Sequence, residues 1–107
     1  MDLQAFQASL QGDAPPPGLS AALVGVWHAL RGEWEQAHDA VQPSDPACSW
    51  VHAVLHREEG DLPNARYWYG RAGRPEGAGE LAAEYRALAA TLLEEAPLEE
   101  AQLKEVP

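Results

Sequence analysis

The sequence between residues 49 and 73 is SWVHAVLHREEGDLPNARYWYGRAG, and it contains two amphipathic segments that meet at Gly60. Apolar side chains recur in each segment at the three- and four-residue spacing of one helix face. Gly60 ends the first segment, Asp61 is a favourable N-cap for the second, and Pro63 falls in a first turn, where its missing N–H costs little. So short a connection predicts two antiparallel helices, a helical hairpin.

The rest of the chain continues this pattern and predicts an all-α fold. Apolar residues make up 46% of the 107 residues, alanine is abundant, and the β-favouring residues valine, isoleucine and threonine are few. Helices are predicted over residues 2–11, 19–31, 33–41, 47–59, 62–72 and 77–95, the last of them ended by Pro97. The chain then divides into an N-terminal arm with a short helix and a proline-rich linker (1–18), a helical repeat domain (19–95) and an acidic tail (96–107).

The negative charge of the chain is unevenly distributed. The formal net charge is -10, with -5 in residues 1–48 and -6 in residues 75–107, whereas residues 49–74 carry +1. An acidic surface repels phosphate backbones, so a nucleic-acid partner is not expected. The longest mostly apolar stretch, residues 19–30, is too short to span a membrane, so no membrane partner is expected. Cys48 is the single cysteine and the N-terminus does not resemble a signal peptide, so a cytoplasmic location is expected.

The hairpin at residues 49–73 has a counterpart 28 residues earlier in the chain. At that offset the small residues, rings and turn glycines of the two segments align: Gly25 with Ala53, His28 with His56, Gly32 with Gly60, Ala37 with Ala65, and Val41 with Tyr69. A small residue allows two helices to approach closely, and a ring three residues later fills the space above it. Stacked copies of such a hairpin form a solenoid.

These residues resemble a known family pattern. The spacing of Gly25, His28 and Ala37, and the block G-D-x-x-x-A-x-x-W-Y-x-x-A at residues 60–72, are similar to tetratricopeptide and Sel1-like repeats. The chain is also similar to small bacterial proteins of unassigned function that carry the same G-D, N-A and W-Y elements. The resemblance implies a stack of α-hairpins and a role in binding peptides or partner proteins.

The expected architecture is therefore a compact tetratricopeptide-like solenoid of two α-hairpins, with the helix of residues 77–95 as a C-terminal capping helix. Two hairpins leave apolar ends exposed. We expect the N-terminal arm, or a second copy of the chain in a homodimer, to cover one of these ends.

A line of possible metal ligands lies on the predicted helix of residues 47–59. His52 and His56 are four residues apart, with Cys48 one turn before them and Glu59 one turn after. Two turns of one helix cannot complete a tetrahedral site, and the repeat alignment offers His28 as the third ligand. The alternative is a structural role, in which the ring at His56 fills space between helices and hydrogen-bonds a carbonyl.

A second candidate site is a stripe formed by Tyr67, Arg71 and Arg74, which are spaced i, i+4 and i+7 along one helix. One ring and two guanidinium groups can bind a carboxylate or an acidic peptide through stacking and bidentate contacts. The alternative is that the arginines form salt bridges with Glu76, with Glu80 or with the acidic tail.

Three further residues are assigned by their position on predicted helices. Trp50 begins its helix beside a proline turn and is expected at a surface or an interface, where an indole ring is both apolar and hydrogen-bonded. His38 falls on the apolar side of the second helix and is expected to be an interior histidine. Cys48 borders the apolar face of its helix and is expected to pack in the core.

The function predicted from the sequence is a noncatalytic interaction module for a peptide or protein partner, with no cofactor and no catalytic residues. Partner binding is assigned to Trp50, Tyr67, Arg71 and Arg74. The alternative function is a small metal-binding protein or metal-dependent enzyme. Its ligands would be His28, His52 and His56.

Overall fold

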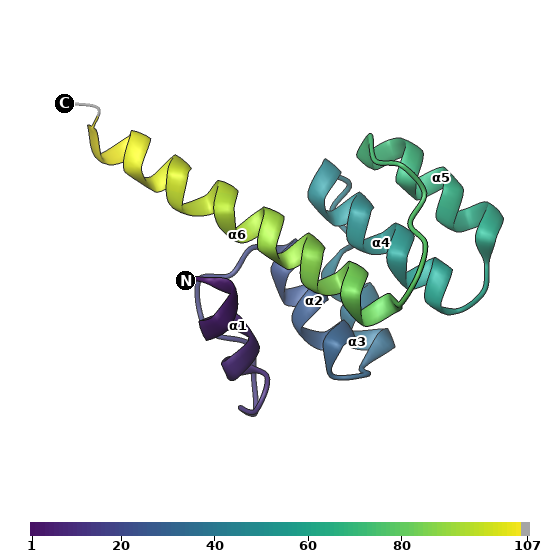
Figure 1. Cartoon of the computed structure of the whole chain (residues 1–107), viewed down its shortest axis with the longest axis horizontal. Helices are drawn as coiled ribbons and strands as arrows, with labels where there is room; N and C mark the ends of the chain where they lie inside the picture. Colours follow the sequence, from purple (N-terminus) through teal and green to yellow (C-terminus); the bar gives the residue numbers. More distant parts are fainter. Residues whose placement is uncertain (106–107) are drawn as a thin grey trace.

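The structure is a computed structural model that describes the backbone of residues 1–105 and the side chains of residues 1–95. Within that range the backbone forms helices and no strand, so the prediction of an all-α fold is confirmed (Figure 1). The helices are α1 (Leu3–Ser9), α2 (Ala21–Leu30), α3 (Trp34–Ala40), α4 (Pro46–Glu58), α5 (Leu62–Ala72) and α6 (Leu81–Glu105).

Two helical hairpins, α2–α3 and α4–α5, form the body of the molecule (Figure 1). Each hairpin turns at a left-handed glycine, Gly32 with φ 78° and Gly60 with φ 86°, a conformation that costs glycine little. In both corners the amide after the glycine donates to a histidine carbonyl five residues earlier. The pairs are Glu33 N to His28 O at 2.9 Å and Asp61 N to His56 O at 3.0 Å. The two corners therefore have the same local structure, 28 residues apart.

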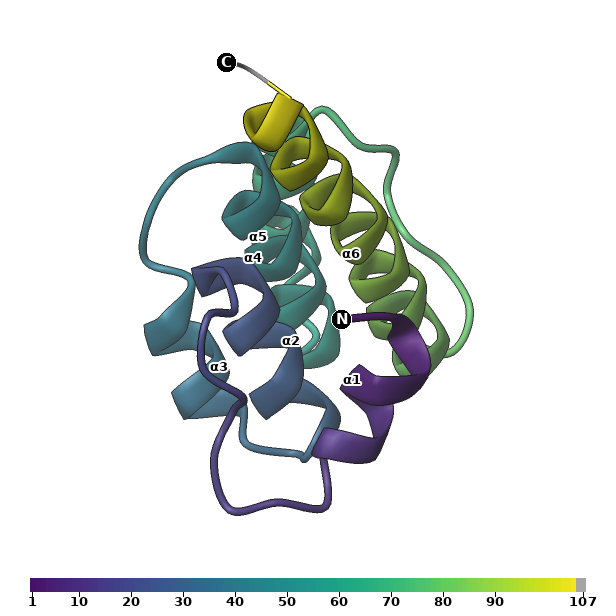
Figure 2. The same cartoon turned by 90° about the vertical axis from the view of Figure 1, so that its left-hand side faces the viewer.

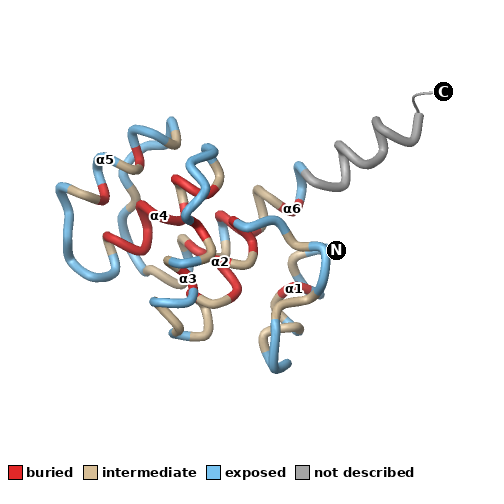
Figure 3. The backbone as a smooth tube through the Cα atoms, turned by 180° about the vertical axis from the view of Figure 1, so that it is seen from behind, coloured by how far each residue is buried: buried red, intermediate tan, exposed pale blue. Residues whose placement is uncertain are grey.

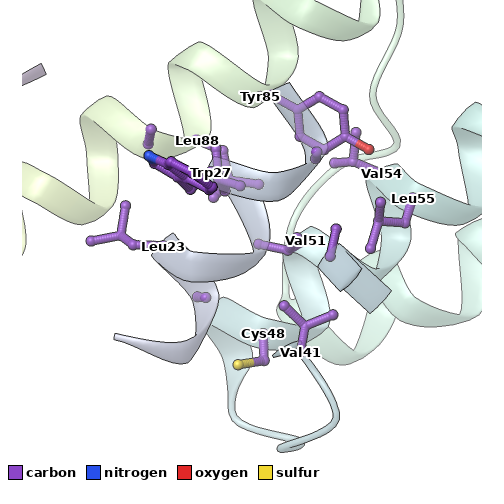
Figure 4. Close-up of a cluster of buried hydrophobic side chains, with 14 of the residues drawn as sticks. Leu23, Trp27, Val41, Cys48, Val51, Val54, Leu55, Tyr85 and Leu88 are labelled. Atoms are coloured by element: carbon purple, nitrogen blue, oxygen red, sulfur yellow. The ribbon is translucent and has the colours of Figure 1, made fainter. Parts of the chain in front are cut away.

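Gly25 allows the first hairpin to close tightly against its neighbours. A Cβ atom at this position would lie 2.5 Å from Val41 Cγ1 and 3.3 Å from Val51 Cγ1, so α2, the end of α3 and α4 meet here. Val41 and Val51 are fully buried in a core to which Trp27 and Leu88 also contribute (Figure 4). The core therefore lies between the two hairpins and α6.

The last helix crosses the first helices of both hairpins. It packs on α2 and α4 instead of stacking after α5 as the next layer of a solenoid (Figure 2). Tyr85 and Leu88 are the residues of α6 that Figure 4 shows in the core. The helix begins at Leu81 and not at residue 77, because Gly79 has φ 84°, a value that a right-handed helix cannot include. It also continues past Pro97 to Glu105, so the prediction that Pro97 ends it is wrong. The proline removes one backbone donor without ending the helix.

The N-terminal segment is packed onto the rest of the molecule. Phe6 of α1 is fully buried in the core, and α1 lies against α6. Figure 3 shows a buried position within α1 between half-buried and exposed ones. Trp27 Nε1 donates to Ser9 Oγ at 3.2 Å, and Arg31 Nη1 donates to the carbonyl of Leu10 at 2.8 Å. The predicted arm is thus joined to α2 and α6 by both apolar and polar contacts. Among all the helices that the structure describes, none has the combined length and apolar character needed to cross a bilayer.

Candidate functional site

Three imidazole rings meet where α3 faces α4. His52 and His56 lie one turn apart on α4, and His38 approaches them from α3. The ring of His38 is 4.6 Å from that of His52 and 5.6 Å from that of His56, measured between centroids, and the two rings on α4 are 4.8 Å apart. Each residue offers one ring nitrogen, and the three nitrogens all lie within 4.8 Å of one another. These residues are called the histidine cluster below.

His28 is not part of the histidine cluster, so the structure corrects the ligand set expected from the repeat. Its Nδ1 atom lies 2.9 Å from Oε1 of Glu33 at the corner of the first hairpin. His56 makes a similar contact at the second corner, with Nδ1 2.6 Å from Oε1 of Glu59, although Glu59 is not the repeat equivalent of Glu33. His28 and His56 are at equivalent positions of the repeat and so lie in different hairpins. The histidine of α3 that lies beside α4 is His38.

Trp34 lies one turn before His38 on the same side of α3. Trp34 Nε1 donates to the carbonyl of Leu55 at 2.9 Å, which places that side of α3 against α4. Its ring also stacks on His38, with centroids 4.9 Å apart and an interplanar angle of 8°. Cys48 is fully buried and lies outside the cluster, as expected for a packing residue.

Burial holds His52 in its neutral form. The side chain is only 8% exposed, and its ring stacks on Trp68 with centroids 4.0 Å apart and an interplanar angle of 7°. Desolvation, followed by the neighbouring rings of His38 and His56, lowers the pKa of His52 to about 4. At neutral pH this imidazole therefore has a lone pair on one ring nitrogen and no charge.

The predicted stripe of Tyr67, Arg71 and Arg74 is divided into two pairs. Gly73 ends α5 in a left-handed conformation, so Arg74 leaves the line of the helix. Arg74 lies 4.0 Å above the ring of Trp50, measured from Cζ to the ring centroid. Arg71 remains on α5 and donates from Nη1 to the hydroxyl of Tyr67 at 3.2 Å. Trp50 is therefore combined with Arg74, while Tyr67, 55% exposed, is combined with Arg71.

A hollow of about 420 Å³ opens beside Trp50 and Arg74. The loop of residues 75–80 and the start of α6 form the rest of its wall. Each of its three lining carboxylates has its own arginine. The pairs are Glu76 with Arg66 at 2.9 Å, Glu80 with Arg86 at 3.6 Å, and Glu84 with Arg57 at 2.7 Å.

The arginines of the stripe do not form the salt bridges considered from the sequence with Glu76 or Glu80. Both glutamates pair with other arginines, and no carboxylate among residues 1–95 forms an ion pair with Arg71 or Arg74. The third partner considered, the acidic tail of residues 96–107, lies outside the side chains that the structure describes. Among the described residues that line the hollow, Arg74 is thus the charged residue without an ion-pair partner.

Comparisons with protein-family models, with curated proteins and with solved structures give no match to this chain. The resemblance to tetratricopeptide and Sel1-like repeats therefore stays a prediction from the residues that carry it.

Proposed function

We propose that the protein is an interaction module that binds a carboxylate-bearing segment of a partner at the hollow beside Trp50 and Arg74. The observation that supports this proposal is the charge around the hollow. Its three lining glutamates are paired with other arginines, whereas Arg74 has no ion-pair partner among the described side chains. The protein as a whole has a net charge of -10 and repels acidic ligands, but this guanidinium group attracts them locally.

The contact between Arg74 and Trp50 prepares the guanidinium group for binding. Stacking on the indole ring restricts the long arginine side chain, so less conformational entropy is lost when a ligand arrives. The planar fork of N–H donors can bind a carboxylate through two hydrogen bonds. The half-buried Trp50 ring offers an apolar surface to a neighbouring side chain of the same ligand.

The size of the hollow limits what it can hold. A volume of about 420 Å³ falls within the range of roughly 300–1,000 Å³ that is usual for small-ligand sites. It is large enough for one or two side chains of a peptide and too small for a folded domain. The ligand class proposed here is therefore a short peptide segment that has a carboxylate next to an apolar residue.

Calorimetric titration with synthetic peptides tests this proposal. The peptides pair a leucine or an aromatic residue with either a carboxylate or the corresponding amide, so that only the charge differs. We expect saturable binding of carboxylate peptides and little or no binding of their amides. Arg74→Ala should weaken the binding by about tenfold or more, because a hydrogen bond to a charged group contributes roughly 1.5–3 kcal/mol.

The matched control is Arg71→Ala, which removes the same charge from the same end of α5 but does not line the hollow. This variant should bind carboxylate peptides as the unmodified protein does. Equal losses in both variants would show that only net charge matters and would contradict a site at the hollow. Equal binding of carboxylate and amide peptides would contradict the proposed ligand class.

A further inference from the structure

We infer that His38, His52 and His56 bind one divalent transition-metal ion of the zinc type, in a site that is separate from the peptide hollow. The three side chains come from two elements, α3 and α4, and their ring nitrogens already lie within 4.8 Å of one another. Imidazole is a favoured ligand of zinc, copper and nickel. None of the cluster residues lines the hollow beside Trp50, so the two sites can be tested independently.

The spacing of the nitrogens is close to that of a loaded site. Zinc–nitrogen bonds of about 2.0–2.1 Å in tetrahedral geometry place ligand nitrogens about 3.3 Å apart. A contraction of at most about 1.5 Å is therefore needed, which side-chain rotations can supply while the helices stay in place. His52 and His56 are four residues apart on one helix, the spacing used by helix-borne zinc ligands, and His38 supplies the ligand that a single helix cannot.

Glu59 fixes the orientation of one ligand. Its Oε1 atom lies 2.6 Å from Nδ1 of His56, so Nδ1 carries the proton that it donates to the carboxylate. The lone pair of His56 is then on Nε2, where a metal can bind it. A carboxylate bonded to the other nitrogen of a histidine ligand is a common outer-shell partner in metal sites. Asn64 Nδ2, at 3.3 Å from Nε2, is the contact that the metal would replace.

His52 lacks a hydrogen-bond partner within the described part of the chain, although it is almost completely buried. No protein group in that part of the chain therefore competes for its lone pair, and its ring lies beside those of His38 and His56. No described side-chain nitrogen or oxygen is cut off from both solvent and partners, so the ring nitrogens of His52 still contact solvent. That contact gives an ion a path to the cluster.

The surroundings of the cluster favour a defined site. Trp34 stacks on His38 and Trp68 stacks on His52, so the rings of two ligands are each held by an indole. Rings held in this way lose little freedom when the metal binds. Three protein ligands leave a fourth position for water or another small ligand, as in zinc sites that stay open.

Calorimetric titration of the full chain with zinc chloride tests the inference. The protein carries no histidine tag and is first stripped of metal with a chelator. We expect saturable binding of one zinc ion per chain. Glu59→Gln removes an outer-shell partner and should lower the zinc affinity by roughly 10–100-fold. His38→Gln removes a ligand and should lower the affinity by more than that range.

His28→Gln is the matched control, because His28 contacts a corner glutamate as His56 does but lies outside the cluster. It should bind zinc as the unmodified protein does. Cobalt(II) provides a second measurement: an intense visible spectrum of tetrahedral cobalt should appear in the unmodified protein and be absent in His38→Gln. Far-ultraviolet circular dichroism shows whether each variant is folded, and His38 is the ligand chosen for substitution because it is only half-buried.

Three results would overturn the inference. The first is the absence of saturable zinc binding by the unmodified protein. The second is equal affinity in a folded His38→Gln variant, which would assign the zinc to other ligands, such as His56 with Glu59 and Asp61. The third is an equal loss of affinity in His28→Gln. Peptide binding at Arg74 is measured without zinc, so failure of one proposal is distinguishable from failure of the other.

Discussion

Arg57 donates two hydrogen bonds to one oxygen of Glu84, from Nη2 at 2.7 Å and from Nε at 3.0 Å, and so joins α4 to the first turn of α6. The hydroxyl of Tyr69 donates to the other carboxylate oxygen at 2.6 Å. Gly77 leaves room for this carboxylate, because a Cβ atom there would overlap it. Burial, followed by the adjacent Glu84, raises the pKa of Tyr69, so the tyrosine keeps the proton that it donates. One carboxylate thus connects three helices.

Arg57→Ala is expected to destabilise the protein strongly. The side chains of Arg57 and Glu84 are only 15% and 13% exposed, so the substitution leaves a largely buried carboxylate without its cation. Removing one partner of a buried pair costs about 3 kcal/mol or more of unfolding free energy. Urea denaturation followed by circular dichroism measures the change.

The control for that prediction is Arg86→Ala. Its pair with Glu80 has a distance of 3.6 Å and side chains that are 43% and 74% exposed. Solvent screens such pairs, so the loss should be below about 1 kcal/mol. Similar losses in the two variants would show that the Arg57–Glu84 contact is not a structural connection between α4 and α6.

Alanine substitutions at two helical glycines are expected to act in opposite directions. At Gly25 the new methyl group would lie 2.5 Å from Val41 Cγ1, so overpacking should cost about 1–3 kcal/mol. At Gly70 no atom lies within 4 Å of the new methyl group, so the substitution should stabilise the protein by about 0.5–1 kcal/mol. Thermal unfolding of both variants checks the prediction. A Gly25→Ala variant as stable as the unmodified protein would contradict the close approach of α2 to Val41 at the end of α3.

Cys48 is expected to resist alkylation in the folded protein. Burial, followed by the neighbouring Asp45 carboxylate, raises the pKa of its thiol to about 12, and the side chain is almost completely enclosed. An unfolded cysteine has a pKa of about 8.5, so at about pH 9 the folded protein contains roughly a thousandfold less thiolate. Mass spectrometry after iodoacetamide treatment should show slow modification in buffer and rapid modification in urea. Equal rates in the two conditions would contradict the burial of Cys48.

The helical hairpins could be predicted because their signals are local. Gly32 and Gly60 adopt positive φ angles where the pattern places a stop, and Asp61 caps α5 by accepting from the amide of Asn64 at 3.4 Å. These contacts join residues a few positions apart, so a short stretch of sequence contains both partners. The end of α6 could not be predicted in this way, because Pro97 is a local stop signal that the helix passes.

The candidate sites were predictable only in part. His52 and His56 share a helix, so their proximity follows from the sequence alone, whereas His38 joins them through the packing of α3 on α4. Trp50 and Arg74 each suggested a binding role, but no spacing along the chain indicates that they stack on each other. Likewise, no pattern in the sequence indicates that Arg57 of α4 and Tyr69 of α5 both bond to Glu84.

The helices, their corners and the 28-residue repeat are properties of the amino-acid sequence, because periodicity, caps and glycine turns act over one or two helical turns. The position of α6 across α2 and α4, the burial of Phe6 and the third ring of the histidine cluster are properties of the tertiary structure. They depend on how side chains of distant elements fill a common core, and no single segment specifies that packing. Both proposed sites lie where such elements meet.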